Sequence, residues 1–537
     1  MTMSMTHEAS ASAATLAEGN ARLGIELGST RIKAVIVGDG ETTLATGSAG
    51  WENRYIDQTW TYSLDAVWQG IQQAYAAACA DAELRYGVRP TGFAAIGISA
   101  MMHGYLAFDK DGHELVPFRT WRNTSTGRAA AELTDLLEYN VPLRWSIAHL
   151  YQAVLDGEPH LGELDFCTTL AGYVHWQLSG RKVLGVGDAS GMFPIDDITH
   201  DWDPARAAKV DDLLARHHTS LRIEEIFPRP LDAGHRAGTL STAGALLLDP
   251  SGRLDAGIPL CPPEGDAGTG MVATNAVAPR TGNVSVGTSI FAMVVLERPL
   301  VSVHTEIDLV TTPAGHQVAM VHCNNGASEL GSWADLFHDF AQRIGVPADR
   351  DAVFAALLGA ALEGEPDAGG LLAYNALAGE PVIGLDEGRP MIVRTPDSAL
   401  TLANFMRAQV YASFASLSLG MRTLTAQAVG LDTMYAHGGV FRTADVAQRF
   451  LAAAIETPVA VSATAGEGGA WGMAVLASYL VSGNGRSLET FLADDVFAAV
   501  ASTTIVPSDA DVAGYRAYLE RYEAGLAAER AAVAVLR

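Results

Sequence analysis

Short apolar stretches separated by glycine dominate the first hundred residues. Residues 22–28, 31–38 and 42–49 are three of them, each of a length suited to one strand. Residues 63–84 then place apolar side chains at helical spacing, and 93–98 form another apolar stretch. The pattern predicts three consecutive strands, a helix and a fourth strand, which together form an α/β layer.

A similar pattern returns late in the chain. Residues 283–287 and 289–296 are predicted strands around a Gly-Thr-Ser turn, and 433–437 is a third strand. Residues 402–429 and 468–481 are predicted helices, the second rich in small residues. The stretches ELGSTRIKAVIV and SVGTSIFAMVV share one order: strand, glycine with two hydroxyl residues, strand. This predicts two similarly folded halves with a cleft between them and a boundary near residue 270.

The first twenty residues differ from the rest in composition. They are rich in Ala, Ser and Thr, and the first Lys or Arg is Arg22, so no charged segment precedes an apolar one. We expect a disordered tail over 1–20 rather than a signal peptide. The predicted domains are then 21–270 and 271–537. The longest charge-free window, 91–108, is broken by Gly, Ser and His, which argues against a membrane span.

Charge and cysteine content exclude several classes of function. The 537 residues contain 35 Lys and Arg against 61 Asp and Glu, a net charge of −26. Such a chain repels nucleic acid and anionic membranes, so a phosphate ligand must be met locally by N–H groups, a metal or a few cations. The four cysteines lie far apart without a CxxC motif, which favours buried free thiols over a disulfide framework or a zinc site.

Two glycine turns with hydroxyl side chains are candidate phosphate sites. The first, Gly28-Ser29-Thr30, is preceded by Glu26, which could hold Mg²⁺ through water, and is followed by Lys33. The second is Gly287-Thr288-Ser289. The alternative is two ordinary hairpin turns, the first supported by an ion pair of Glu26 and Lys33. Two such turns in comparable positions of a duplicated fold favour a shared nucleotide.

Further candidates lie on loops. Asp266 is framed by glycines and could accept a proton from a hydroxyl, although Asp among glycines is more often a turn or cap residue. Met102 and His103 follow a buried strand, where α/β folds place ligand contacts, and His103 could donate to a sugar hydroxyl. A satisfied core histidine is the alternative. Trp121 could flank a sugar and Asn123 could pair with its hydroxyls, unless Trp121 is a packed surface residue.

Taken in this order, the motifs resemble those of the FGGY carbohydrate kinases, members of the actin/hexokinase/heat-shock ATPase superfamily, from about residue 23 to 480. The resemblance implies two ribonuclease-H-like (actin-like ATPase) domains of α/β class with an interdomain cleft. It implies ATP and Mg²⁺ as cofactors. The implied roles are a catalytic base for Asp266; metal contacts for Glu26 and Asp266; sugar contacts for Met102, His103, Trp121, Asn123 and Asp266; and nucleotide contacts for Gly28, Ser29, Thr30, Lys33, Gly287, Thr288, Ser289, Gly438 and Gly439.

Met102-His103-Gly104 looks like the xylulokinase branch, in which Met-His lies against a ketopentose. The sequence departs from the family at several positions. Glu26 stands where most members have Asp, and Ala267 where xylulokinases often have Asn. Gly185 and Gly187 replace the Asp and Ser of a TDxSxAS-type segment. These departures put xylulose itself in doubt, while the kinase chemistry is retained in outline.

The sequence therefore predicts a cytoplasmic, ATP-dependent carbohydrate kinase that phosphorylates a primary hydroxyl of a small sugar such as xylulose or ribulose. Its expected partners are the sugar and ATP, not nucleic acid or membrane, and a homodimer is left open. An actin-like ATPase that activates another protein is the rival, and it would need no sugar pocket. A sugar-binding regulator would need a helix-turn-helix motif and a basic patch, and neither is evident.

Overall fold

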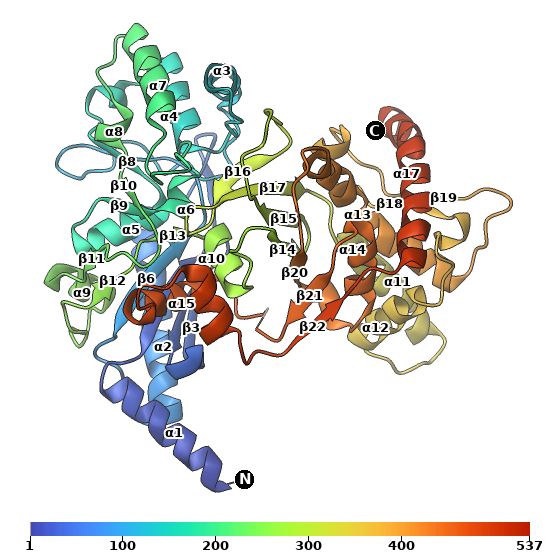
Figure 1. Cartoon of the computed structure of the whole chain (residues 1–537), viewed down its shortest axis with the longest axis horizontal. Coiled ribbons are helices and arrows are strands. Elements are labelled where there is room, and N and C mark those ends of the chain that lie inside the picture. The colour runs from blue at the N-terminus through green and yellow to red at the C-terminus, as the bar shows by residue number, and fades with distance from the viewer. Residues whose placement is uncertain (1, 465, 537) are drawn as a thin grey trace. The chain divides into compact units, whose positions relative to one another are not determined.

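The computed structural model describes residues 2–464 and 466–536, with the side chains of residues 2–8 left undescribed. The described chain forms two compact units (Figure 1). The first unit contains residues up to Ala278 together with Asp308–Val318 and Glu467–Ala499. The second unit contains Pro279–Ile307, Ala319–Gly466 and the chain from Val500 onward.

The first unit is built on a mixed sheet of order β11-β12-β6-β1-β2-β3, with β13 also paired to β6. Its strands and those of its small two-stranded sheets are β1 (Arg22–Leu27), β2 (Arg31–Val37), β3 (Thr43–Gly50), β4 (Arg54–Ile56), β5 (Thr59–Thr61), β6 (Ala95–Ala100), β7 (Leu106–Phe108), β8 (Phe166–Thr168), β9 (Val183–Gly185), β10 (Arg229–Leu231), β11 (Gly238–Thr239), β12 (Pro259–Leu260) and β13 (Glu264–Gly265), with β16 (Asp308–Thr311) in the returning segment. β1, β2 and β3 form an antiparallel meander, and β6 runs parallel to β1. The predicted order of three strands, a helix and a fourth strand is confirmed, with β4 and β5 added before the helix.

The helices of the first unit are α1 (Thr2–Ala17), α2 (Leu64–Tyr86), α3 (Gly127–Leu137), α4 (Ser146–Asp156), α5 (Leu170–Ser179), α6 (Val186–Ala189), α7 (Pro204–Arg216), α8 (Ile223–Ile226), α9 (Thr242–Leu248), α10 (Asp266–Ala273), α15 (Gly469–Ser482) and α16 (Leu488–Phe491). Local chemistry sets the ends of α2. The Ser63 hydroxyl accepts a hydrogen bond from the N–H of Ala66, and Gly87 closes the helix in the left-handed region at φ 70°.

Two helices cover the two faces of the first sheet. Gly24 of β1 pairs through β2 with Thr46, so the neighbouring Gly47 points to the opposite face. A Cβ added at Gly24 would lie 2.1 Å from the carbonyl oxygen of Ala470 in α15, and one added at Gly47 would lie 2.1 Å from that of Ala74 in α2. Both helix backbones therefore rest directly on the strands, which only glycine allows.

The second unit repeats this arrangement. Its sheet runs β17-β15-β14-β20-β21-β22, with β14 antiparallel to β15 and parallel to β20, as β1 is to β2 and β6. Its strands are β14 (Thr281–Val286), β15 (Ile290–Val295), β17 (Gln317–Cys323, beginning at the unit boundary), β18 (Leu372–Tyr374), β19 (Met391–Val393), β20 (Thr433–His437), β21 (Val459–Ser462) and β22 (Ser502–Ile505), and its helices are α11 (Ser328–Arg343), α12 (Arg350–Ala361), α13 (Leu402–Ala426), α14 (Val446–Ile455) and α17 (Asp509–Val535). The predicted internal duplication is thus present.

The predicted disordered tail is wrong for the described residues of that segment, because Thr2–Ala17 form helix α1. Alanine, abundant in this segment, has the highest helix propensity, and α1 packs against α2. Leu16 is 1% exposed and belongs to the core of the first unit. Composition alone suggested a solvated tail, but one buried leucine and a helical neighbour give the segment a place to pack.

The two predicted domains also differ from the two units. The first unit continues to Ala278 instead of 270, and two later segments return to it. One of them carries α15, which Figure 1 shows in red among the blue strands of the first unit. The small residues of α15 allow the close approach to β1 described above. The segment 467–499 therefore returns to the first unit and places this helix on one face of its sheet. Within the described residues, no helix combines the length and apolar character needed to cross a membrane.

Candidate active site

Glu26 stands near the end of β1 with its carboxyl group largely buried. Lys33 is its direct partner on β2, and the backbone N–H of Ala470, at the start of α15, donates to it. Burial and then the charge of Asp266 raise the pKa of Glu26, while Lys33 and the Ala470 N–H oppose that rise. A Cβ on Gly469 would lie 2.2 Å from Glu26 Oε1, so glycine at this helix start makes room for the carboxyl group.

Two aromatic side chains hold the first glycine turn. Trp51 Nε1–H donates to the carbonyl oxygen of Gly28 at 2.7 Å, and the Tyr62 hydroxyl donates to that of Ser29 at 2.6 Å. The two rings stack with centroids 4.1 Å apart. Thr30 at the tip is exposed, so its hydroxyl group is available to a ligand. The turn is therefore fixed from behind and open at its tip.

Asp266 is the first residue of α10, directly after strand β13. The side chain is half-buried, and its Oδ1 accepts a hydrogen bond from the N–H of Met102 at 3.2 Å. Burial raises the pKa of Asp266, while the N–H groups of Met102 and Ala267 act against that rise. Two candidates predicted independently, the glycine-framed aspartate and the Met-His segment, thus meet in the structure.

The donor set of Glu26 and Asp266 fits a divalent cation. Burial raises the pKa of both carboxyl groups, and the charge of Asp266 raises the pKa of Glu26 further. A cation beside both groups relieves that repulsion, and Mg²⁺ prefers a small number of carboxylates with several waters. The residue types present therefore fit Mg²⁺, and the metal site stays a prediction.

His103 has an unusual backbone conformation. Its φ is 69° and that of Gly104 is 92°, two consecutive residues in the left-handed region. Histidine occupies this region rarely and at an energetic cost, and such strain is concentrated at functional sites. A Cβ at Gly104 would lie 2.7 Å from the carbonyl oxygen of Arg119, so only glycine fits there. The loop is thus held in a conformation that its own residues do not favour.

The imidazole of His103 is buried and its hydrogen-bond role is defined. Burial and then the charge of Arg144 hold its pKa well below the usual range, so the ring is neutral near pH 7. Nδ1 lies 3.2 Å from the carbonyl oxygen of Gly191, which can only accept, so Nδ1 carries the proton. Nε2 is then an acceptor. The donation to a sugar hydroxyl that was expected of His103 is therefore not available from Nε2 in this tautomer.

The structure does not support sugar binding by Asn123. Its side-chain amide donates to the carbonyl oxygens of Trp60 and Thr120 at 2.9 and 3.0 Å, and its Oδ1 accepts from the N–H of Trp60 at 2.8 Å. These bonds attach the segment to β5, which is a structural role. Trp121 is half-buried, and the guanidinium group of Arg122 lies 5.3 Å from its ring centroid.

The second glycine turn lies between two glycine backbones. A Cβ at Gly326 would lie 2.5 Å from the carbonyl oxygen of Gly287, and one at Gly438 would lie 2.1 Å from that of Val286. The N–H of Gly326 also donates to the carbonyl oxygen of Thr288 at 2.7 Å. Gly438 has φ 127°, whereas a Cβ at Gly439 would meet nothing within 4 Å. The open space beside Gly439 is compatible with the predicted nucleotide contact.

Several residues at the site were not predicted from sequence. Glu264 and Asp188 are buried carboxyl groups beside Asp266, and burial raises the pKa of Asp188 to about 7. No local signal pointed to Glu264, whose partners are distant in sequence.

The residues that support the two turns were also missed. Trp51 and Tyr62 hold the first turn, and Asn325 precedes Gly326 at the second. For Asn325 and Gly326 the sequence offers a weak signal, because Asn-Asn-Gly directly follows an apolar strand.

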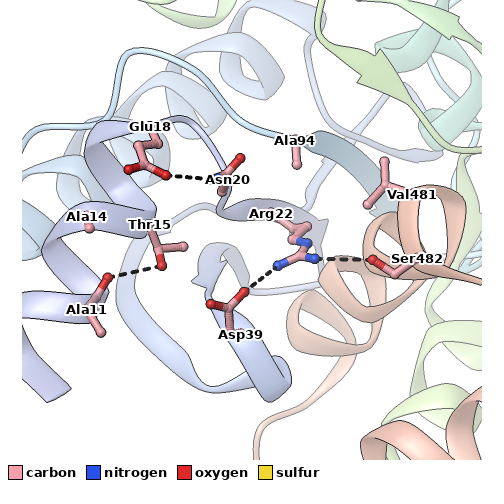
Figure 2. Close-up of a pocket in the computed structure, with 10 residues that line it drawn as sticks. All are labelled: Ala11, Ala14, Thr15, Glu18, Asn20, Arg22, Asp39, Ala94, Val481 and Ser482. Atoms are coloured by element: carbon pink, nitrogen blue, oxygen red, sulfur yellow. Dashed lines mark hydrogen bonds and ion pairs between the residues drawn. The ribbon is translucent and has the colours of Figure 1, made fainter.

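A surface pocket of about 520 Å³ lies elsewhere in the first unit (Figure 2). Arg22 is paired there with Asp39 at 3.5 Å and donates to the Ser482 hydroxyl at 3.3 Å. Glu18 accepts from the side-chain amide of Asn20 at 3.0 Å. The guanidinium group of this pocket already has its carboxylate partner, and none of the predicted site residues lines the pocket. It is therefore not the candidate active site.

The fold has many solved relatives. Xylulose kinase from Lactobacillus acidophilus aligns with TM-score 0.75 and 16% identity over 95% of this chain and 98% of that chain. Gluconate kinase from the same organism aligns with TM-score 0.75 and 17% identity over the same shares. Plasmodium falciparum glycerol kinase aligns with TM-score 0.71 and 14% identity, again over 95% and 98%. At these identities the likeness shows the fold, a two-domain α/β protein of the actin-like ATPase class.

Sequence comparison identifies the family. The model of the N-terminal domain of the FGGY family of carbohydrate kinases matches residues 21–146, and that of the C-terminal domain matches residues 282–481. Together they cover more than half of the chain, which therefore belongs to the FGGY family of carbohydrate kinases. No curated protein matches the sequence significantly.

Proposed function

We propose that this protein transfers the γ-phosphoryl group of ATP to a primary hydroxyl of a small sugar, a ketopentose such as xylulose or ribulose. The observation that carries the proposal is the hydrogen bond from the N–H of Met102 to Asp266 Oδ1 at 3.2 Å. It joins the proposed sugar-binding segment to the proposed base, so a hydroxyl held by that segment lies within reach of a proton acceptor.

In this mechanism Asp266 accepts the proton of the primary hydroxyl as the oxygen bonds to phosphorus and ADP leaves. Burial raises the pKa of Asp266, which makes the carboxylate a stronger base than an exposed aspartate. His103 Nε2 accepts a hydrogen bond from a second hydroxyl of the sugar and orients the sugar. The rest of the rate comes from positioning and charge, as in other phosphoryl transfers.

The cofactors are assigned to the residues predicted for them. Glu26 and Asp266 would hold Mg²⁺ through water ligands, and the ion would neutralise phosphate charge. The hydroxyl side chains and Lys33 at the first turn would bind phosphate oxygens, as would Thr288 and Ser289 at the second. Gly438 and Gly439 would lie against the adenosine. The space beside Gly439 is open, since a Cβ added there would meet no atom within 4 Å.

A panel of acceptors tests the proposal. Xylulose, ribulose, gluconate and glycerol are each added to enzyme with Mg·ATP, and ADP release is followed. We expect release to be stimulated by a ketopentose, whereas a protein-activating ATPase would show no dependence on any sugar. Gluconate belongs in the panel because xylulose and gluconate kinases match this fold equally well.

Variants then connect the activity to the site. Asp266→Asn should lower kcat at least ~100-fold while ATP binding is retained, and Asp255→Asn, at an exposed position, is the matched control. His103→Ala should raise KM for the sugar several-fold, corresponding to about 0.5–1.5 kcal/mol for one hydrogen bond, with little change in KM for ATP. Near-normal turnover of Asp266→Asn would remove Asp266 as the base.

A further inference from the structure

Glu264 is a buried acid immediately before the Gly265-Asp266 pair. The residue is 1% exposed and forms strand β13 with Gly265. Its carboxyl group fills the space beside two glycines of another segment: a Cβ on Gly185 would lie 2.1 Å from Oε1, and one on Gly187 would lie 2.4 Å from Oε2. These are the two glycines at which the sequence departs from the family pattern. Glu264 and the pair of glycines therefore fit each other sterically.

The same carboxyl group supports helix α6. Its Oε2 accepts a hydrogen bond from the N–H of Asp188 at 2.9 Å, and its Oε1 accepts one from the N–H of Gly187 at 3.4 Å. The N–H groups in the first turn of a helix have no partner within the helix and need one from outside. An apolar side chain of the same size would fill the space but leave these donors unsatisfied in a buried place.

Helix α6 leads directly to Gly191, which contacts the loop of Met102 and His103. Gly191 follows it and accepts the Nδ1–H of His103 at 3.2 Å. A Cβ on Gly191 would lie 2.7 Å from that nitrogen and 3.0 Å from Cε of Met102, so the backbone at Gly191 is in close contact with both side chains. A displacement of α6 would therefore move the His103 imidazole, to which the proposed function assigns a sugar contact.

We propose that Glu264 is a positioning residue that fixes α6, and through Gly191 the Met102-His103 loop, in the geometry that binds the sugar. The inference rests on the proposed function and adds a determinant of sugar affinity to it. Glu264 touches neither sugar nor nucleotide in this role. Its effect reaches the sugar through two backbone hydrogen bonds and one histidine.

The first test separates sugar affinity from nucleotide affinity. Glu264→Ala should raise KM for the accepted ketose at least fivefold, a modest loss for two hydrogen bonds that act on a neighbouring loop, while KM for ATP changes less than twofold. Glu264→Gln, which keeps an acceptor oxygen for the Asp188 N–H, should stay within about twofold of wild type for both. Both variants are assayed well below their melting temperatures. Equal changes in the two KM values, or a lowered melting temperature without a KM change, would overturn the positioning role.

A double-mutant cycle tests the steric fit independently of catalysis. Gly187→Ala in the wild-type chain should lower the melting temperature, because the added Cβ would lie 2.4 Å from Oε2 of Glu264 and no nearer than 3.4 Å to any other residue. In the Glu264→Ala background the same change should cost much less, since the space is then free. Additive effects would contradict the packing on which the inference depends.

The failures of the two proposals are distinguishable. If no sugar stimulates ADP release in the wild-type enzyme, the proposed function fails and the positioning role fails with it, whatever the melting curves show. If a ketose is accepted but Glu264→Ala leaves its KM unchanged, the proposed function stands and only the role of Glu264 is refuted.

Discussion

The two glycine turns have the same local sequence pattern but are supported in different ways. In the first, Leu27 pairs with Ile32 and leaves four residues in the turn; in the second, Val286 pairs with Ile290 and leaves three. The first turn is held by hydrogen bonds from the side chains of Trp51 and Tyr62. The second is held by close backbone contact with two glycines.

This difference indicates how each turn responds to change. A side-chain hydrogen bond contributes about 0.5–1.5 kcal/mol and can be removed without displacing the backbone. A contact that only glycine permits is different, because any side chain displaces the turn itself. We therefore expect the first turn to lose function gradually and the second to fail at single positions.

The largest effect is expected at Gly438. Gly438→Ala places a Cβ 2.1 Å from the Val286 carbonyl oxygen at a residue with φ 127°. Strain and overpacking together should lower the free energy of unfolding of the second unit by about 3 kcal/mol or more. ATP affinity, measured by calorimetry, should fall at least about tenfold. Gly439→Ala is the control, since its Cβ meets nothing within 4 Å, and equal behaviour of the two variants would contradict the steric explanation.

The next effect concerns a chemical difference between the turns. The residue two positions before the turn glycine is Glu26 in the first turn and Ser285 in the second. If Glu26 holds Mg²⁺ through water, Glu26→Ala should raise the Mg²⁺ concentration for half-maximal activity by about tenfold or more. Glu26→Asp should retain Mg²⁺-dependent turnover, because water ligands can absorb a small displacement.

The alternative is a structural role, in which Glu26 accepts the Ala470 N–H and pairs with Lys33. In that case Glu26→Ala would lower the melting temperature and leave the Mg²⁺ midpoint unchanged. The same titration on Ser285→Ala serves as control, since no metal contact is assigned to the second turn.

A smaller effect is expected from the aromatic support of the first turn. Trp51→Phe and Tyr62→Phe each remove one donor while keeping a ring in the stack. Each should reduce the free energy of unfolding of the first unit by about 0.5–1.5 kcal/mol and raise KM for ATP by no more than about tenfold. A loss as large as that of Gly438→Ala would show that the two turns are not supported differently.

Local pattern predicted what local physics decides. The strands around both turns and the long helix predicted at 402–429, which ends at Ala426, follow from apolar spacing and glycine turns. The family resemblance assigned both Asp266 and Met102 to the sugar site, but not the hydrogen bond between them. The rest depends on distant contacts. α15 belongs to the first unit because Gly24 accepts its backbone, Asn123 is occupied by Trp60, and the tautomer of His103 is set by Gly191. None of these partners is adjacent in sequence.

The smallest expected effect depends on pH and concerns Glu380, which binds Asn325, the residue before Gly326 at the second turn. It is fully buried, and its Oε2 accepts from the N–H and the side-chain amide of Asn325, each at 3.1 Å. Burial raises the pKa of Glu380 above 4.5. A carboxyl group with a raised pKa in the folded state stabilises it fully below pH 4.5, and that stabilisation is lost as pH rises through the folded-state value. Glu380→Gln does not titrate, so its melting temperature should gain on wild type as pH rises above 4.5.

Tyr62→Phe is the control, because the pKa of Tyr62 is raised above 10 and its hydroxyl stays protonated throughout. A melting difference between Glu380→Gln and wild type that does not vary with pH would mean that Glu380 keeps its charge in the folded protein, stabilised by the Asn325 donors, and that the two turns share the same pH response.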